Sequence, residues 1–519
     1  MRRPTRSLAV LGSTVAVATS LTGAFSGAGA ATLSALPAVH PFATKAPAAA
    51  FVAAGRSDLG VACARPDGRV STTIHCYTPD QMRAANHLGP LASSTDGAGQ
   101  TIVLVDAYGT PTGANDLARF AQQYGGPTPS FETYYPLGSP DYKSATGNGS
   151  GTSGPTAAEG WAGEATLDIE WAYAIAPKAH IVLLATPPAE TQGVQGLPNL
   201  MKAIDAAIVR YPKGTVFSMS FGTDESAFGS SAAAKAQFAK FDATFQRGLA
   251  NGDTFFASSG DNGSVGVTRA HHQTATSPDP QVSYPNVSPY VTSVGGTQLQ
   301  SGWTWDPRVD KPFNADGTRN VDYWNWNSGG DTQPVWNEGW ASIGTGGGLS
   351  TVYSRPAYQN GVSSVVGTHR GVPDVAWNAA VNGGVLVYRS FFPSIDGPPS
   401  WDVYGGTSAA SPQAAAMTAI GNQARKAAGK APIGDLNSWL YSSAAATYRG
   451  AGLLDVVPVK DGITPSGNLH DNQMWDTAAD GTLVRDGVPG YPTTGGYDLT
   501  TGWGVPQGGA WTTLVLSKP

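Results

Sequence analysis

Short apolar runs alternate with helical stripes through most of this chain, and this alternation restricts the fold more than any other feature. The runs are typical of strands buried on both faces, as in parallel sheets. They are TIVLVDAY (101–108), AHIVLLA (179–185), TVFSMSFG (215–222), TFFASSG (254–260), YVTSVGG (290–296) and GVLVY (384–388). Helical spacing of apolar residues predicts helices near 114–124, 161–175, 200–211, 238–249 and 408–425. This order predicts an α/β fold, a doubly wound parallel sheet with helices on both faces.

Composition narrows the possible partners. Charged residues make up 13% of the chain, against a usual fraction of about 25%. The formal net charge is −6, so the sequence carries no excess of basic residues. We therefore expect no nucleic-acid partner.

Residues 1–30 have the pattern of a secretory signal peptide. MRRPTRS supplies the positive start, the run from Leu8 to Leu21 is apolar, and Ala28-Gly29-Ala30 has the form of a cleavage site. The apolar run is too short to cross a membrane. We expect a secreted, extracellular protein with no membrane attachment once the signal is removed.

Residues 31–95 are rich in Ala, Pro and Gly and have weak periodicity, which is typical of a short pro-segment or an N-terminal extension. The globular pattern occupies 96–519. Cys63 and Cys76 are the two cysteines of the chain. In an oxidising compartment we expect them to form a disulfide, with two free buried thiols as the alternative.

Two carboxylates stand four residues apart in GEATLDIEW (163–171), where helical spacing stacks Glu164 and Asp168 on one face. A solvated helix face is the ordinary interpretation of such a pair. Here the neighbouring residues are mostly apolar, so we expect both acids to be buried. Burial and mutual repulsion raise the pKa of such a pair, which can then relay a proton at acid pH.

A serine follows a glycine-rich turn in GGTSAASP (405–412). Gly405 and Gly406 allow a sharp turn, and Ser408 then lies at a helix start, where free N–H groups can hold an oxyanion. An ordinary N-cap serine is the alternative. With two carboxylates as its base, this serine points to a peptidase that works at low pH.

Asp261 lies in ASSGDNG (257–263), directly after an apolar run. Ligands of open α/β sheets bind beyond the carboxyl ends of the strands. A protonated Asp261 there can donate a hydrogen bond to an oxyanion. The alternative is a plain Asp-Asn-Gly turn.

Together these residues resemble the sedolisins, serine-carboxyl peptidases with a subtilisin-like fold. Glu164 and Asp168 match the E-x-x-x-D pattern of that family, Ser408 and Pro412 match G-T-S-x-x-x-P, and Asp261 matches S-G-D-x-G. The resemblance covers roughly residues 95–519 and extends to SMSFG (218–222), SYPNVSPYVTSVGGT (283–297), GTGGGLS (344–350), RPAYQ (355–359) and GVPDVAW (371–377). The chain departs from the family in one respect, because sedolisins usually carry a large folded N-terminal propeptide and 31–95 is short.

The resemblance implies a serine-type endopeptidase that forms an acyl-enzyme on Ser408. Glu164 would be the general base, Asp168 would orient it and share its proton, and Asp261 would donate to the oxyanion. Substrates would be proteins or peptides, and we expect a monomer.

The resemblance also implies C-terminal calcium-binding loops with one structural Ca²⁺. LLDVV (453–457) would supply the Asp455 side chain and the Val456 carbonyl. TTGGYDLTTGWG (493–504) would supply Asp498 and the carbonyls of Thr494 and Gly496. Oxygen ligands of this kind suit Ca²⁺. Ordinary Asp and Gly turns are the alternative.

Two other functions fit parts of the sequence. One is a catalytically weak or inactive, secreted binding protein on a peptidase scaffold, which the intact set of four residues disfavours. The other is a glycosidase that uses Glu164 and Asp168, with sugar platforms from the tryptophans of 301–345, a segment that we interpret as an insertion or long surface loop. Glycosidase carboxyls flank the substrate from opposite sides, whereas two acids on one helix face point the same way.

Two residues resemble parts of the ordinary subtilisin triad. His369 in GTHRG (367–371) lies too close to Ser408 in the chain for the subtilisin order, and Pro373 indicates a loop around it. Asp106 ends the first apolar run, where subtilisins place their Asp. Without a histidine partner we expect Asp106 to be structural.

Overall fold

The computed structural model describes residues 40–53, 62–140, 142, 155–187, 196–266, 279–300, 313–318, 333–392, 398–460, 468–477 and 482–519. The chain divides into two compact units, residues 1–35 and 36–519, and all described residues belong to the second. The expected signal peptide and most of the tryptophan-rich segment therefore lie outside the described residues. In the part of the chain that is described, none of the helices combines the length and the apolar character that a membrane crossing requires.

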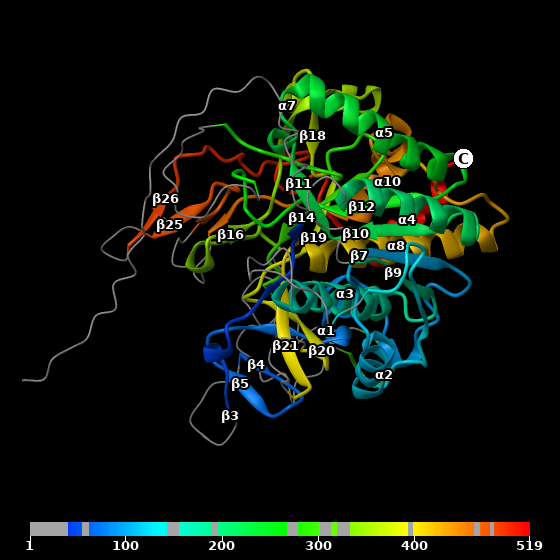
Figure 1. Ribbon diagram of the computed structural model, residues 1–519, viewed down its shortest axis with the longest axis vertical. Coiled ribbons are helices and arrows are strands. Elements are labelled where there is room, and N and C mark those ends of the chain that lie inside the picture. Colours follow the sequence, from blue (N-terminus) through cyan, green and yellow to red (C-terminus); the bar gives the residue numbers. More distant parts are fainter. Residues whose placement is uncertain are drawn as a thin grey trace, which may run out of the picture. The chain divides into compact units, whose positions relative to one another are not determined.

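The centre of the second unit is a seven-stranded sheet (Figure 1). All pairings within it are parallel. Its order is β19 (Val375–Asn378), β14 (Thr292–Thr297), β12 (Thr254–Ser258), β10 (Val216–Met219), β7 (Thr101–Ala107), β9 (His180–Thr186) and β8 (Ser130–Tyr134). From β7 the chain first builds outward to β8 and β9 and then crosses to β10, so the order reverses between β7 and β10. The predicted parallel sheet is confirmed.

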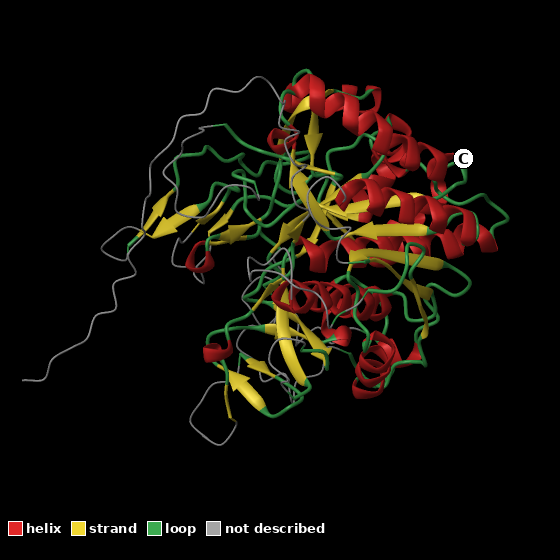
Figure 2. Ribbon diagram, viewed as in Figure 1, coloured by secondary structure: helices red, strands yellow, loops and turns green. Residues whose placement is uncertain are grey.

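Helices cover both faces of this sheet (Figure 2). Strand β7 explains why, because Ile102 and Leu104 face one core while Val103 and Val105 face the other. On the first side lie α3 (Pro155–Ile175) and α8 (Thr407–Ala427), which also contact each other. On the second side lie α4 (Gly196–Arg210) and α5 (Ser231–Ala250). A helix α2 (Gly113–Gln123) packs on α3.

Two predictions about strands need correction. TVFSMSFG forms β10 and then a second strand, β11 (Phe221–Asp224), which pairs antiparallel with β13 (Ser283–Tyr284) outside the main sheet. GVLVY forms β20 (Gly384–Arg389), and the expectation that it joins the parallel sheet is wrong. It pairs antiparallel with β21 (Ser400–Gly405), because a short connection joins the two and an antiparallel pair needs no crossover helix.

The N-terminal part packs onto this framework through short elements. The predicted disulfide Cys63–Cys76 is present. Strand β6 (Cys76–Tyr77) pairs with β20, and helix α1 (Pro79–Ala85) begins at Thr78 with a capping box and contacts α3. The remaining short strands here are β1 (His40–Pro41), β2 (Thr44–Lys45), β3 (Val52–Ala53), β4 (Cys63–Ala64) and β5 (Arg69–Ser71).

The C-terminal part surrounds the same framework. Helix α11 (Gly508–Ser517) packs on α8 and on α10 (Ala446–Gly452). The other elements are β15 (Asn337–Glu338), β16 (Ile343–Gly344), β17 (Gly348–Ser354), α7 (Ser363–Val366), β18 (His369–Val372), α9 (Leu436–Leu440), β22 (Leu453–Leu454), β23 (Val459–Lys460), β24 (Asn468–Leu469), β25 (Trp475–Thr477), β26 (Leu483–Arg485) and β27 (Val505–Pro506).

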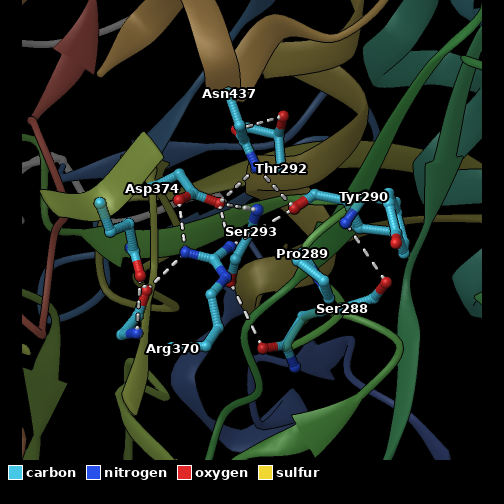
Figure 3. A network of polar contacts seen from close by, with 12 residues as sticks. Ser288, Pro289, Tyr290, Thr292, Ser293, Arg370, Asp374 and Asn437 are labelled. Atoms are coloured by element: carbon cyan, nitrogen blue, oxygen red, sulfur yellow. Dashed lines mark hydrogen bonds and ion pairs between the residues drawn. The ribbon is translucent and has the colours of Figure 1, made fainter. Parts of the chain in front are cut away.

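A buried ion pair holds one edge of the sheet. Figure 3 shows Arg370 of β18 facing Asp374, which directly precedes β19. The guanidinium donates to both carboxylate oxygens, at 2.7 and 2.6 Å, and neither side chain is exposed. Asp374 also accepts from the Ser293 N–H at 2.8 Å and from the Tyr441 hydroxyl at 2.7 Å. The pair therefore ties β14 and β19 to the C-terminal helices, and among the described residues only the Nε of its guanidinium has no hydrogen-bond partner.

Candidate active site

The polar residues of the site gather at the carboxyl ends of the central strands. Asp106 is the second-to-last residue of β7. Ser220 directly follows β10, and Asp261 lies shortly after the end of β12. This is the edge, next to the order reversal, where parallel sheets bind ligands. The helices α3 and α8 bring Glu164, Asp168 and Ser408 to the same place.

Helix α3 presents its acids to the protein interior. Glu164 and Asp168 are fully buried, so the expected burial is confirmed and the solvated-face interpretation is wrong. Glu164 Oε2 accepts from the Ala43 N–H at 2.7 Å, and Asp168 Oδ1 accepts from the Ser220 hydroxyl at 3.0 Å. The other oxygen of each carboxyl, Glu164 Oε1 and Asp168 Oδ2, has no hydrogen-bond partner among the described residues. Each acid therefore keeps one oxygen ready to hold or receive a proton.

Asp106 is a third buried carboxyl beside this pair. It is fully buried, and neither of its oxygens has a hydrogen-bond partner within the described ranges. Its charge acts on both Glu164 and Asp168. Sequence reasoning treated Asp106 as structural, although an acid at the carboxyl end of an otherwise apolar strand was a usable signal.

Burial sets the protonation of these groups. It raises the pKa of Glu164, the Asp106 charge raises it further, and the Ser408 hydroxyl and Ala43 N–H oppose the rise. Burial also raises the pKa of Asp168, with the charges of Asp106 and Glu164 adding to it and the Ser220 hydroxyl opposing it. Burial alone raises the pKa of Asp106. The cluster therefore retains protons at a pH where exposed carboxyls have lost theirs.

Ser408 is the second residue of α8. The N-cap is Gly406, whose φ of 103° is a conformation that glycine adopts easily, so the N-cap interpretation of Ser408 is wrong. The serine is fully buried, and its Oγ donates to the Ser220 carbonyl at 3.4 Å. Ser220 thus contacts the serine through its carbonyl and Asp168 through its hydroxyl. Motif reasoning missed Ser220, although it lies in the quoted SMSFG segment.

Asp261 is fixed by the residue before the serine. Its Oδ1 accepts from the Thr407 N–H at 2.7 Å and from the Thr407 hydroxyl at 2.8 Å, and that hydroxyl also accepts from the Gly260 N–H at 3.0 Å. Burial raises the pKa of Asp261 to about 7, with the Thr407 hydrogen bonds opposing the rise. Its side chain therefore anchors the start of α8 rather than closing a local turn. Oδ1 accepts two short hydrogen bonds from Thr407, whereas Oδ2 has a single long contact, with the Thr44 hydroxyl at 3.5 Å, so the proton of the neutral acid belongs on Oδ2.

The predicted calcium ligands lie on two C-terminal segments, 455–456 and 494–498, which a hydrogen bond joins. Asp455 Oδ2 accepts from the Gly496 N–H at 2.8 Å, and Asp498 Oδ2 accepts from the Thr494 N–H at 3.0 Å. The two carboxylates thus bracket the turn whose carbonyls were predicted as ligands, and Val456 follows Asp455 directly. Among the described residues no cluster of three or more His, Cys, Asp or Glu side chains could hold a metal, so an ion here needs backbone oxygens as well. Such a donor set, all oxygen with two carboxylates, fits Ca²⁺.

Comparison with known proteins identifies the family. A family model described as "Subtilase family" matches residues 141–453. Kumamolisin from Bacillus sp. (strain MN-32) is 30% identical over 376 residues, which are 70% of this chain and 55% of kumamolisin. Sedolisin from Pseudomonas sp. (strain 101) is 30% identical over 281 residues, 53% of this chain and 36% of that protein. This chain belongs to the sedolisin family of subtilases.

Other relatives agree with that family assignment. Tripeptidyl-peptidase 1 from Canis lupus familiaris is 26% identical over 460 residues, 85% of this chain and 65% of that protein. The chain thus spans 55% of kumamolisin and 65% of tripeptidyl-peptidase 1. A solved structure of Pseudomonas sedolisin, a serine-carboxyl proteinase, superposes on this chain with a TM-score of 0.60 at 23% sequence identity. The superposition includes 86% of this chain and 99% of the sedolisin chain. The subtilisin-like α/β fold predicted from the sequence is confirmed.

His369, which resembled part of an ordinary subtilisin triad, lies outside the site described above. His369 begins β18 rather than lying in a loop, because its segment pairs with β17, and its side chain is exposed. Its Nδ1 contacts the Ser350 carbonyl at 2.8 Å, and none of the hydrogen bonds among the described residues joins it to Glu164, Asp168 or Ser408. Trp336 is a buried core residue whose indole donates to Glu338 at 2.8 Å, so it offers no platform for a sugar.

Proposed function

We propose that this protein is a serine-carboxyl endopeptidase that hydrolyses peptide bonds at acid pH through an acyl-enzyme on Ser408. The observation that carries the proposal is the contact of Ser408 and Asp168 with one residue, Ser220, while Asp261 is tied to Thr407 beside the nucleophile. Membership of the sedolisin family supports the same reaction class.

In the first half of the reaction, Ser408 Oγ attacks the carbonyl carbon of the scissile bond and its proton moves to Glu164. Glu164 Oε1 suits this role because it is buried and has no hydrogen-bond partner among the described residues. Asp168 holds the pair's shared proton. Glu164 then returns the proton to the leaving nitrogen as the C–N bond breaks.

The negative charge that develops on the carbonyl oxygen needs a donor. Asp261 supplies it from Oδ2, together with the backbone N–H of Ser408. The pKa of about 7 keeps this carboxyl neutral in acid and ionised above neutrality, where it would repel the oxyanion. Water then attacks the acyl-enzyme by the same steps and frees Ser408.

The same proposal includes a secreted monomer with protein or peptide substrates, a removable signal in residues 1–30, a pro-segment or extension in 31–95 and a peptidase domain in 96–519. It also includes one Ca²⁺ held by Asp455 and Asp498 with the carbonyls of Val456, Thr494 and Gly496. The ion would supply fixed positive charge that holds two C-terminal segments together.

The decisive experiment replaces the nucleophile. Ser408→Ala should lower kcat/KM on a denatured protein substrate at pH 4 by roughly 10⁴-fold or more, since loss of a nucleophilic serine removes the covalent step. Ser411→Ala is the matched control, because Ser411 is a buried serine of the same helix whose hydroxyl bonds Ser218 at 2.8 Å. The control should retain activity within a few fold. Equal activity of Ser408→Ala and wild type would exclude Ser408 as the nucleophile, and a wild type without activity would favour a non-catalytic binding protein.

A further inference from the structure

Helices α4 and α5 lie side by side on the face of the sheet opposite to α3 and α8, and a hollow opens between them (Figure 1). We call it the α4–α5 hollow. Its volume is about 400 Å³, within the range of about 300–1,000 Å³ that small-ligand pockets occupy. None of the proposed catalytic residues lines it. It is therefore a candidate binding site separate from the active site.

The floor of the α4–α5 hollow is apolar. Met201 of α4 is 4% exposed and Phe241 of α5 is 7% exposed, and both line the hollow. The Phe241 ring is supported from the core, where its centroid lies 5.7 Å from that of Tyr284. Because both side chains are already packed, an apolar group that enters the hollow leaves water without requiring the protein to rearrange.

The rim of the α4–α5 hollow is cationic. Lys202, Lys240 and Arg247 line it with one carboxylate, Asp205, so its formal charge is +2, whereas the chain as a whole carries −6. All three cationic side chains are exposed. A local positive charge on an acidic protein favours an anionic ligand at this place.

Arg247 and Asp205 neutralise each other at one end of the hollow. They are the last residues of α5 and α4 that line it, and they form an ion pair across it. Arg247 Nε donates to Asp205 Oδ1 at 3.2 Å, and Arg247 Nη2 donates to the Thr244 hydroxyl at 3.1 Å. This end is closed by paired charges. The positive charge left for a ligand is therefore that of Lys202 and Lys240, which lie on opposite walls.

Three side chains of the hollow have unused hydrogen-bonding capacity. Lys202 Nζ donates to Asn199 Oδ1 at 3.1 Å and has two further N–H groups. Among the described residues, none forms a hydrogen bond or ion pair with Lys240 or with the half-buried side-chain amide of Gln237. Ammonium groups donate to carboxylates, and an amide both donates to and accepts from a peptide group.

We propose that the α4–α5 hollow binds the C-terminal end of a peptide whose last residue is apolar. The α-carboxylate pairs with Lys202 and Lys240. The last side chain rests on the floor formed by Met201 and Phe241, and the preceding peptide group bonds to Gln237.

Simpler ligands use only part of the α4–α5 hollow. An inorganic anion leaves the apolar floor in water, and an uncharged apolar molecule leaves the two ammonium groups without a partner. A fatty acid uses the floor and the ammonium groups but not Gln237. An α-carboxyl has an ordinary pKa of about 3.3–3.7, below about 3.9 for Asp and about 4.3 for Glu, so at acid pH a peptide C-terminus is more fully ionised than an acidic side chain.

Peptides of this kind are what a peptidase makes, because each cleavage creates a new α-carboxylate. That the ligand is a product of this enzyme rests on the proposed function, whereas its binding does not. Since none of the proposed catalytic residues lines the α4–α5 hollow, a product bound there leaves the place of the next substrate free.

The first test measures binding to Ser408→Ala, which cannot consume a peptide, by NMR titration at pH 5. N-acetyl-Gly-Leu with a free carboxylate should bind with a Kd of roughly 0.1–1 mM, as expected for a ligand of this size. The same compound with a C-terminal amide should bind more weakly by about tenfold or more. Equal binding of the acid and the amide would overturn the role of the carboxylate, and no binding of the acid up to about 10 mM would overturn the site.

The second test locates the ligand. In the Ser408→Ala background, Lys202→Ala with Lys240→Ala should weaken binding of N-acetyl-Gly-Leu by about tenfold, since two exposed ion pairs are lost. Lys235→Ala is the matched control, because Lys235 is an exposed lysine of α5 that does not line the hollow, and it should change the Kd by less than about twofold. A Kd that the double exchange leaves unchanged would place the ligand elsewhere and overturn the proposal.

The third test separates a peptide from a fatty acid. Octanoate carries a carboxylate and an apolar chain but no peptide group, so it should bind more weakly than N-acetyl-Gly-Leu by about fivefold. Gln237→Ala should remove this difference. Octanoate that binds as tightly as the peptide would overturn the peptide ligand in favour of a fatty acid.

The two proposals can fail separately. Carboxylate-dependent binding at the α4–α5 hollow in a protein that cleaves no peptide would overturn the proposed function, and with it the product as the source of the ligand, but not the site. A protein that cleaves peptides at acid pH and shows no such binding would overturn this inference alone.

Discussion

Asp261→Asn is the exchange that best separates charge from shape in this site. Asp261 is 5% exposed, and burial raises its pKa from an ordinary 3.8 to about 7. Because the pKa of Asp261 is higher in the folded than in the unfolded protein, folding favours its protonated form. The contribution of Asp261 to the free energy of unfolding is therefore fully present below the unfolded pKa near 3.8 and is lost as the pH rises through about 7.

The size of the effect can be worked out from the shift. One pKa unit corresponds to about 1.4 kcal/mol, so a shift of about three units corresponds to about 4 kcal/mol of unfolding free energy between pH 4 and pH 8. Asparagine can keep the local geometry, because its carbonyl replaces Oδ1 as the acceptor from Thr407 and its amide lies at the Oδ2 position. It does not titrate. We therefore expect Asp261→Asn to match its parent at pH 4 and to be the more stable protein at pH 8.

Urea unfolding followed by tryptophan fluorescence would measure this. Both proteins should carry Ser408→Ala, which prevents self-digestion, and calcium should be constant. Asp316→Asn is the control, since Asp316 is exposed, and its hydrogen bonds from Thr318 lower its pKa, so its titration lies below this pH range. A difference between Asp261→Asn and its parent that stays constant from pH 4 to pH 8 would refute the burial argument.

Activity should respond in parallel. With Ser408 intact, wild-type kcat/KM should fall about tenfold per pH unit above the Asp261 pKa of about 7. At pH 5 the kcat/KM of Asp261→Asn should be roughly tenfold below that of wild type, a smaller loss than the about 10²–10³-fold cost of removing an oxyanion donor altogether. Above pH 7 its kcat/KM should not show the decline that the ionisation of Asp261 causes in wild type. A wild-type optimum near pH 8 would contradict the donor role.

Three further sets of changes probe the paired acids, the calcium loops and the buried ion pair. Glu164→Gln and Asp168→Asn should each lower kcat by about 10²-fold or more. The double variant should be little worse than either, because the effects of groups that act as one unit are not additive. If steady-state rates show that the loss in the double variant is the product of the two single losses, the two acids do not share a proton. Removal of calcium with a chelator should lower the Tm, as should Asp455→Ala and Asp498→Ala. A ligand that binds only the folded state stabilises the protein by about 2.7 kcal/mol when its concentration is 100 times its Kd. A wild-type Tm that does not depend on calcium would exclude the ion. Asp374→Ala should cost about 3–5 kcal/mol of unfolding free energy, because it leaves a buried guanidinium unpaired, and a loss below about 1 kcal/mol in urea unfolding would refute the role of the ion pair.

Much of the fold could be predicted because its signals are local. TIVLVDAY and TFFASSG are apolar enough to require burial on both faces. The α3 segment is apolar on almost every side, with its two acids at helical spacing, and the α8 segment follows a glycine turn. The same holds for the candidate catalytic residues, whose motifs each lie within one segment. Their convergence results from parallel topology, which places the ends of successive strands at one edge.

The pairing of the N-terminal segment 40–46 could not be predicted from its own sequence. β1 and β2 are two residues long, and each is stabilised by pairing with a strand much later in the chain, β11 or β21. Residues 31–95 have weak periodicity, so nothing local specifies that pairing. The influence of Asp106 could not be predicted for a related reason, because its effect on Glu164 and Asp168 depends on a distance across the fold rather than on its neighbours in sequence.

The acid preference that we propose has its origin in where α3 lies rather than in which acids it carries. Glu and Asp at helical spacing are common on exposed helices, where water keeps both ionised near neutrality. Here α3 packs against β7, β9 and α8, and burial is the largest cause of the raised pKa of both acids. The N-terminal segment 40–46 covers the same groups, since its Ala43 N–H donates to Glu164 and Ser408 beside it is fully buried.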